Sequence, residues 1–481
     1  MADLLNNTLF YFDQQKQEPF KVVDAVKGVQ IFGGIGSGKT SGSGKWIAKS
    51  FLMSGMGGIV LCGKPDEAET WIEYANDPKI GRAKDIIHFK EGTEFFFNPL
   101  EYERRRIGEG GGLTSNLTTL FLNLYKLGSR ISGGEAKEGE KFWESALKRC
   151  LNRVIDLIKM SDEELSVYNM VQIVNSIPDP YEMSIIGNLS ADEDLVSYAE
   201  TNYCFKCAYL ADKNLNRNDY KSIRDFDLVY NYFFKEFPKL HNETRTTIQE
   251  MFLGLAEPFL SGLLADHFAS GLNIFPEMTY EGKIIILDFP VKQYLEAGIY
   301  AQSIFKLIWQ QATERRSVNE STLPVFLWVD ESQYFVNEYD MLFQTTARSS
   351  RACTVFLTQN ISNYYAALGG AASKAKVDSL LGNLSTKIFH ANNDYVTNDW
   401  AAKTIGQAYK NVSSLNNIGG QQATSGLQQQ FNWQVEPRIF TQLKSGGSDN
   451  NFVVEGVIVT TGKEWGVDKK NYSIKGFNQK I

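Results

Sequence analysis

A glycine-rich segment has residue types and spacing that suit the binding of phosphate. It runs GGIGSGKT and fits the pattern G-x-x-x-x-G-K-S/T. Gly33, Gly36 and Gly38 would let backbone N–H groups turn inward around an anion, and a following helix would direct its positive end at the same anion. Lys39 would reach the β- and γ-phosphates of a nucleotide, and the hydroxyl of Thr40 would bind Mg²⁺. The segment therefore predicts a site for ATP and Mg²⁺.

The residues on either side of this segment support that interpretation. GVQIF (28–32) has the pattern of a buried strand, and KWIAKSFL (45–52) that of a helix. A chance match to a short motif is much less common when strand, loop and helix follow in this order. Gly42 and Gly44 fall in the expected first helical turns, where glycine makes a helix locally weak.

A second acidic motif completes the predicted site. The apolar run PVFLWV (324–329) is followed by Asp330 and Glu331. In ATPases with this phosphate loop, an aspartate at a strand end holds the Mg²⁺ shell. An adjacent glutamate is suited to orient and polarise the attacking water. An acidic strand end alone is unremarkable, but its pairing with the phosphate motif favours a hydrolysing motor over a small-molecule kinase.

Two further functional positions are expected around the next strand. Gln359 ends the run CTVFLTQ (353–359), where a polar side chain could contact the γ-phosphate and report its loss. Arg348 and Arg351 precede that run, and an arginine inserted into a neighbouring subunit would neutralise transition-state charge. From spacing alone, each arginine could equally well form a surface ion pair or act as such a finger.

Short apolar runs recur along the chain and predict the sheet that would carry these residues. They are continuously apolar rather than alternating, which is typical of parallel strands buried on both faces. Helical patterns lie between several of them, so the sequence predicts an α/β fold. The runs span residues 28–33, 57–62, 85–89, 283–289, 324–331, 353–359 and 386–391.

The region between the two nucleotide motifs has a different pattern. FWESALKRCLNRVIDLIKM (142–160) places apolar residues on one face of a helix, and strand signals are weak from about 103 to 255. We therefore predict an all-α domain inserted into the nucleotide-binding domain. Residues 411–430, rich in Asn, Gly, Ser and Gln, predict an exposed loop. Residues 451–465 predict a terminal strand and turn. The expected domains span residues 1–102, 103–255 and 256–481.

Composition and charge restrict the classes of protein that fit. The 481 residues are 43% hydrophobic and carry a net charge of −7, which argues against a protein coated in nucleic acid but not against a ring with basic loops in its bore. Five cysteines favour a reducing compartment, and Cys204 and Cys207 lack the further ligands of a zinc site, so they are expected to be half-buried thiols. No run is long enough to span a membrane, and the start lacks a signal peptide. We expect a cytoplasmic protein that meets the inner membrane, if at all, through a partner.

Taken in order, these motifs resemble those of a known family. The elements are the phosphate loop, VLCGKPDEAETW, FFFNPLEY, the helical insertion near KFWESAL, and VDESQYF followed by TARSSRACTVFLTQN. Their order is similar to that in type IV secretion coupling proteins, the TraG/TraD-like conjugative DNA-transfer ATPases of the FtsK–HerA group. Arg348 stands eleven residues before Gln359, which resembles the family's spacing between its arginine finger and its sensor glutamine. Arg348 is therefore preferred to Arg351. Transmembrane helices of membrane-anchored members are absent, and Arg351 stands where the family has glycine.

The resemblance implies a RecA-like ATPase that assembles as a hexamer with sites between subunits. It also implies that DNA, or a DNA–protein substrate, passes through a central channel, with a relaxase and secretion-channel proteins as partners. A related ring motor for genome packaging or DNA processing remains an alternative, as does a nucleotide-gated cargo adaptor without motor activity. The identity of neighbouring genes would distinguish the two kinds of motor. A measurement of ATP hydrolysis would distinguish either motor from the adaptor.

Overall fold

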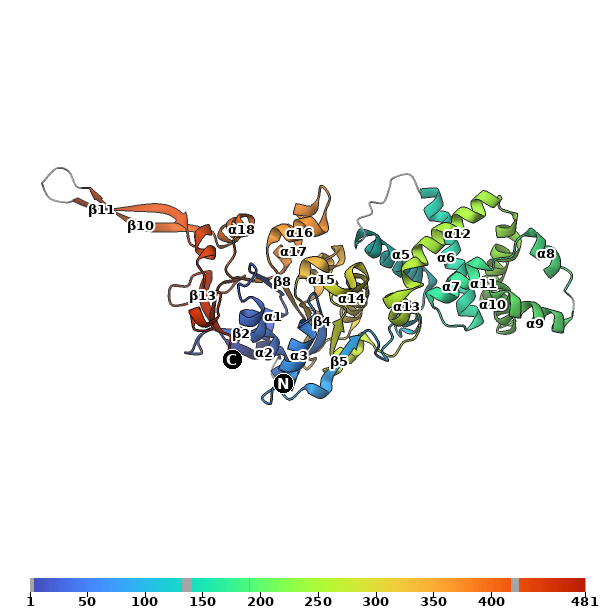
Figure 1. Cartoon of the computed structure of the whole chain (residues 1–481), viewed down its shortest axis with the longest axis horizontal. Coiled ribbons are helices and arrows are strands. Elements are labelled where there is room, and N and C mark those ends of the chain that lie inside the picture. Colours follow the sequence, from blue (N-terminus) through green and yellow to red (C-terminus); the bar gives the residue numbers. More distant parts are fainter. Residues whose placement is uncertain (1–3, 132–140, 190, 417–423, 481) are drawn as a thin grey trace. The chain divides into compact units, whose positions relative to one another are not determined.

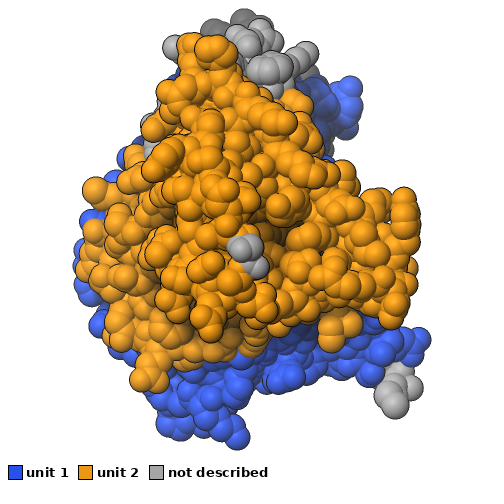
Figure 2. Space-filling view, turned by 90° about the vertical axis from the view of Figure 1, so that its right-hand side faces the viewer, with its two compact units in different colours: residues 1–89, 276–292, 309–481 blue, residues 90–275, 293–308 orange. Residues whose placement is uncertain are grey.

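The computed structural model describes residues 4–131, 141–189, 191–416 and 424–480. These residues form two compact units, drawn in blue and orange in Figure 2. Unit 1 comprises residues 1–89, 276–292 and 309–481, and unit 2 comprises residues 90–275 and 293–308. Unit 2 includes more residues than the helical domain expected at 103–255. The domain boundaries stay a prediction.

Unit 1 is built on a nine-stranded sheet in the order β13-β12-β9-β3-β8-β7-β4-β6-β5. Figure 1 labels β13, β8, β4 and β5 of this sheet. Strands β9, β3, β8, β7, β4 and β6 are parallel, whereas β12 is antiparallel to both β9 and β13. Each of the seven expected runs forms a strand of this sheet, and the predicted α/β fold is confirmed. The strands are β3 (Val29–Phe32), β4 (Gly57–Leu61), β5 (Ile86–Lys90), β6 (Ile284–Asp288), β7 (Val325–Val329), β8 (Ala352–Thr358), β9 (Thr386–Phe389), β12 (Val453–Thr460) and β13 (Tyr472–Asn478).

Helices pack around this sheet, and an aromatic cluster ties two of them to the strand that carries the acidic motif. Trp71 of α3 stacks on Phe326 of β7 with ring centroids 5.3 Å apart, and Phe51 of α2 stacks on the same ring at 5.6 Å. Trp328 meets Trp71 edge-on. Burying such large side chains removes apolar area from water and fixes both helices on β7. The helices of unit 1 are α1 (Val22–Ala25), α2 (Lys45–Met53), α3 (Glu67–Asn76), α15 (Glu338–Thr346), α16 (Ile361–Leu368), α17 (Ser373–Asn383) and α18 (Tyr395–Ile405). Helix α14 (Val291–Arg315) has its two ends in unit 1 and its residues 293–308 in unit 2.

Unit 2 is helical, as the weak strand signals indicated. The apolar stripe of α6 is buried at Leu147, Leu151, Val154 and Ile158, where α6 packs against its neighbours α5, α7, α10 and α12. The helices are α4 (Pro99–Arg105), α5 (Thr114–Ile131), α6 (Lys141–Ser161), α7 (Val167–Asn175), α8 (Pro180–Ile186), α9 (Asp192–Thr201), α10 (Tyr203–Lys213), α11 (Tyr220–Asn231), α12 (Asn242–Ala256) and α13 (Gly262–Phe268).

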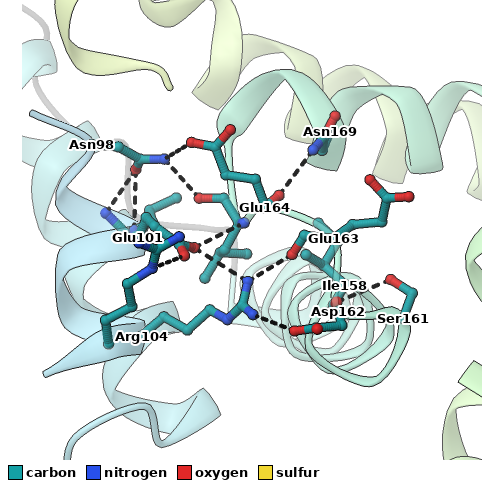
Figure 3. A network of polar contacts seen from close by, with 12 residues as sticks. Asn98, Glu101, Arg104, Ile158, Ser161, Asp162, Glu163, Glu164 and Asn169 are labelled. Carbon is teal, nitrogen blue, oxygen red and sulfur yellow. Dashed lines mark hydrogen bonds and ion pairs between the residues drawn. The ribbon is translucent and has the colours of Figure 1, made fainter. Parts of the chain in front are cut away.

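The Asn-Pro-Leu element of the sequence has a structural task within unit 2 (Figure 3). Asn98 caps α4, since its side-chain oxygen accepts from the backbone N–H groups of the next turn, and its amide donates to Leu165 O at 2.9 Å. Glu101 accepts from Leu165 N at 3.0 Å, and Arg104 donates to Glu163 O at 2.6 Å. Both Asn98 and Glu101 are buried, so these bonds fasten α4 to the segment between α6 and α7.

The thiols of Cys204 and Cys207 lie on α10 and are fully rather than half buried. Burial raises the pKa of the Cys207 thiol to about 11. Within the described residues, no group of three or more His, Cys, Asp or Glu side chains is arranged to hold a metal. None of the helices in the described part of the chain is both long and apolar enough to cross a membrane.

The prediction of a loop at residues 411–430 is wrong for the part of this range that the structure describes. Strands β10 (Gln407–Asn416) and β11 (Thr424–Trp433) pair as an antiparallel hairpin, and residues 417–423 lie outside the described residues. Polar composition indicates a loop, but strand pairing satisfies backbone N–H and C=O groups whatever side chains they carry. At the base of the hairpin, Tyr409 pairs with Phe431, and their ring centroids are 5.2 Å apart. A small second hairpin joins β1 (Thr8–Tyr11) to β2 (Pro19–Lys21).

Candidate nucleotide site

The glycine-rich loop follows β3, as its motif requires. Gly36 and Gly38 have φ of +69° and +78°, a region that favours glycine. A Cβ added at Gly38 would lie 2.5 Å from a methyl group of Val454 on β12, so the loop also needs glycine there for space. Lys39 is buried directly after these turns. This backbone conformation suits an anion-binding loop.

The helix after the loop begins irregularly, as its glycines predicted. Residues Thr40–Gly44 form a π-helical turn in which Gly42 has φ −95° and ψ −107°, and regular α2 begins at Lys45. The Oγ of Ser43 lies 2.7 Å from Nε2 of His390, a buried histidine directly after β9. Burial lowers the pKa of His390 to about 4, so the ring is neutral at pH 7. This bond ties the irregular turn to the sheet.

The acidic motif meets the loop at the carboxyl ends of the parallel strands. Thr40 Oγ1 donates to Asp330 Oδ2 at 3.1 Å, and Asp330 Oδ1 accepts from the Glu331 N–H at 2.8 Å. Glu331 has φ +46°, an uncommon conformation for a residue with a side chain, and such backbone strain clusters at functional sites. A hydroxyl and a carboxylate oxygen in contact are the hard ligands that Mg²⁺ prefers. The residues present therefore fit a Mg²⁺ ion.

Two lysines surround the acidic pair. Glu331 Oε1 lies 3.6 Å from Lys39 Nζ and 2.8 Å from Lys64 Nζ, and Lys64 Nζ is also 3.2 Å from Asp330 Oδ2. The side chains of Lys39 and Glu331 are only 8% and 6% exposed. Burial by itself would raise the pKa of Glu331, but Lys39, Gln333 and Lys64 outweigh it and hold that pKa at about 2. Glu331 is therefore ionised at neutral pH, as a residue that polarises water must be.

Gln359 reaches the same glutamate from the neighbouring strand. Its Nε2 lies 3.4 Å from Glu331 Oε2, and Gln333 donates to the same oxygen at 2.8 Å. The backbone oxygen of Gln359 accepts from Asn392, which follows β9. Because β8 lies between β3 and β7, Gln359 stands between the phosphate loop and the acidic motif. The structure thus brings together Lys39, Thr40, Asp330, Glu331 and Gln359.

The two arginines are separate from this cluster and differ from each other. Arg351 is buried, has φ +50°, and donates to the backbone oxygens of Glu320 and Thr322 at 3.1 and 2.8 Å. Arg348 is exposed in the turn after α15, and its side chain makes no hydrogen bond or ion pair with any residue that the structure describes. Arg351 is therefore engaged in holding a loop, whereas Arg348 is available to another molecule.

Sequence reasoning missed two residues of the cluster. Lys64 follows β4, the strand next to β7, and its segment GKPDE carried a signal because parallel neighbours end at the same edge of the sheet. Gln333 stands two residues after Glu331, in a 3₁₀ turn (Ser332–Tyr334) that the sequence pattern did not distinguish from a helix. Both contact Glu331, so the acidic group is held by four side chains rather than two.

Replacing Lys39 by alanine is expected to weaken ATP binding about 10- to 100-fold, because hydrogen bonds to charged groups contribute about 1.5–3 kcal/mol. Equilibrium titration with a fluorescent ATP analogue measures this. The control is Lys49→Ala, which removes a lysine of the next helix that pairs with Asp77 at 2.7 Å and should bind ATP normally. Unchanged affinity after Lys39→Ala would contradict the assignment of this loop.

The chain was compared with protein families, curated proteins and solved structures. A family described as "TraM recognition site of TraD and TraG" matches residues 324–441, the segment that holds the acidic motif, Arg348 and Gln359. No curated protein matches the chain in sequence.

Solved structures share the fold over the whole chain. The bacterial conjugative coupling protein TrwBdeltaN70, in its unbound monoclinic form, is 9% identical with a TM-score of 0.57. The plasmid coupling protein TrwB has TM-scores of 0.54 in complex with ADP and Mg²⁺ and 0.51 in complex with the non-hydrolysable GTP analogue GDPNP, again at 9% identity. Each comparison covers 100% of this chain and 90% of the other. The family match over residues 324–441 and the shared fold confirm the resemblance of this chain to type IV coupling proteins of the TraG/TraD type.

Proposed function

We propose that the protein is an ATP-hydrolysing DNA translocase of the conjugative coupling type, which works as a hexamer. The observation that carries this proposal is the position of Glu331. Its ionised carboxylate lies beside the Thr40–Asp330 pair and is contacted by Lys39 of the phosphate loop and Gln359 of the next strand. A protein that only binds nucleotide has no need of an ionised glutamate at this point. The nucleotide complexes of TrwB support the use of ATP and Mg²⁺.

Each residue has a role in this mechanism. The N–H groups of the loop from Gly33 to Gly38 and the ammonium of Lys39 hold the phosphates of ATP. Thr40 and Asp330 hold Mg²⁺, which when bound supplies charge neutralisation on the phosphate oxygens. Glu331 orients the attacking water and accepts its proton, and Gln359, which contacts Glu331, transmits the loss of the γ-phosphate.

Arg348 belongs to this proposal as the residue that acts in a neighbouring subunit. Its exposed and unengaged side chain supports that role, and the anchored state of Arg351 argues against the alternative. DNA would pass through the channel of the ring. The family match over residues 324–441 supports recognition of a partner protein of the conjugation apparatus, and the inner membrane would be met through such a partner.

The experiment that tests this function is phosphate release with ATP, with and without DNA, combined with mass measurement in solution. Hydrolysis that rises with DNA, by a six-subunit assembly, supports the translocase. ATP binding without hydrolysis under all of these conditions would replace it by the nucleotide-gated adaptor.

DNA binding is expected to rise together with ATP-dependent assembly and to weaken with salt. A single subunit of net charge −7 has no excess of positive charge to offer, whereas a ring places copies of each cationic loop around one strand or duplex. The affinity should fall with salt roughly as the number of neutralised phosphates. Fluorescence anisotropy of labelled DNA at several salt concentrations, with mass photometry in parallel, measures both quantities. Tight, salt-sensitive binding by a nucleotide-free monomer would contradict this prediction.

A further inference from the structure

Lys64 brings a second ammonium group to the two carboxylates of the site. Its Nζ lies 2.8 Å from Glu331 Oε1 and 3.2 Å from Asp330 Oδ2, which places it between them. The carboxylate side chains are 6% and 3% exposed. Two adjacent buried carboxylates repel each other strongly at low dielectric, and a cation between them offsets that repulsion. Lys64 thus offsets one of the two negative charges, and Lys39, 3.6 Å from Glu331 Oε1, offsets the other.

The position of Lys64 overlaps with the proposed Mg²⁺ site. The oxygen that it contacts, Asp330 Oδ2, is the same oxygen to which Thr40 donates at 3.1 Å. Thr40 and Asp330 are the residues proposed to hold Mg²⁺, which needs ligands at about 2.0–2.1 Å in near-octahedral geometry. An ammonium group at hydrogen-bond distance from that oxygen occupies coordination space and repels a second cation.

Lys64 is also the more exposed of the two lysines. Its side chain is 33% exposed, whereas that of Lys39, which follows the glycine-rich loop, is 8% exposed. Lys64 precedes α3, and on that helix Glu67 Oε2 accepts from Gly63 N at 3.1 Å. The other oxygen of Glu67 is buried and has no hydrogen-bond partner in the part of the chain that the structure describes.

We propose that Lys64 is a positioning residue that bridges Asp330 and Glu331 until Mg²⁺ and nucleotide enter. This inference rests on the proposed function of the site. Lys64 keeps the acidic pair in place while the site is empty, and it competes with Mg²⁺ for Asp330. When Lys64 leaves, Glu331 loses its shortest ion pair and becomes free to orient water. Entry of Mg²⁺ is thereby coupled to the release of the glutamate.

The test is the affinity of the nucleotide-free protein for Mn²⁺, a spectroscopic substitute for Mg²⁺, followed by the EPR signal of free Mn²⁺. Replacing Lys64 by methionine removes the charge and keeps the length of the side chain. Lys64→Met should bind Mn²⁺ about tenfold more tightly, which corresponds to the loss of about 1.4 kcal/mol of competing ion pairing. Lys64→Arg keeps a cation and should bind Mn²⁺ as the unsubstituted protein does.

Matched controls separate this effect from a general change of charge. Lys49→Met removes the lysine of another half-buried ion pair in unit 1 and should leave the Mn²⁺ affinity unchanged. Lys64→Gln serves the same purpose as Lys64→Met if the methionine variant does not fold. Unchanged or weaker Mn²⁺ binding by the neutral variants, or equal tightening by Lys64→Arg, would overturn the proposal.

A parallel titration with fluorescent ADP distinguishes failure of the role proposed for Lys64 from failure of the proposed function. If the unsubstituted protein binds ADP in the presence of Mn²⁺ and the neutral variants show no gain in Mn²⁺ affinity, only the role of Lys64 fails. If the unsubstituted protein binds no ADP at any Mn²⁺ concentration, the proposed function fails and the inference fails with it.

Discussion

Replacing Glu331 by glutamine is expected to leave ATP binding intact and to lower ATP turnover by about 10²- to 10⁴-fold, the range that a general base contributes. Glutamine has the same shape but cannot accept a proton from water. Binding persists because Lys39, Thr40 and Asp330 are unchanged. Phosphate release and titration with a fluorescent ATP analogue measure the two properties in one preparation.

The control for this substitution is Glu103→Gln in unit 2. Glu103 is also a buried, ion-paired glutamate, since its Oε1 lies 2.8 Å from Arg106, and its replacement should leave turnover unchanged. A Glu331→Gln variant that hydrolyses ATP at the normal rate would show that another group acts as the base.

Arg348→Ala is expected to lower turnover by about 10³- to 10⁵-fold, the range of an arginine finger. Since Arg348 would act on a neighbour, this variant and Glu331→Gln should partly restore activity when they are mixed. In such rings, some interfaces pair an intact Arg348 with an intact Glu331. Phosphate release by rings shown by native mass spectrometry to contain both variants measures the recovery.

Arg438→Ala is the matched control for this experiment. Arg438 is exposed and pairs at 2.7 Å with Glu436, two residues before it, so its removal should not affect turnover. Mixed rings that stay inactive would exclude action of Arg348 between subunits, and normal activity of Arg348→Ala alone would exclude it as a finger.

The elements of the nucleotide site were predictable because their signals are local. A buried parallel strand is a continuous apolar run, and a phosphate loop needs glycine at fixed offsets, so β3, β7 and the residues from Gly33 to Thr40 follow from short stretches of sequence. The sheet order was not predictable in this way. Strands adjacent in space are far apart in the chain, and only packing decides that β3 lies between β8 and β9.

The parts that sequence reasoning missed depend on contacts between distant segments. The role of Lys64 arises from the pairing of β4 with β7, so its place in the segment GKPDE did not by itself assign it to the site. The spacing to Gln359 already favoured Arg348 over Arg351, but the burial of Arg351 could not be predicted because the two residues are of the same type. The hairpin of β10 and β11 was missed because backbone pairing leaves little trace in a polar composition.

The place of β3 in the sheet has a consequence for the newly made chain. Val29 pairs with Val355 on one side and with Thr386 on the other, so both neighbours of this strand are made long after it. At about 5–20 residues per second, a ribosome leaves β3 without either neighbour for on the order of tens of seconds. During that time an apolar strand with two open edges is a template for association with other nascent chains. Among the strands of this sheet, the one that leads into the nucleotide loop thus waits longest for its first neighbour.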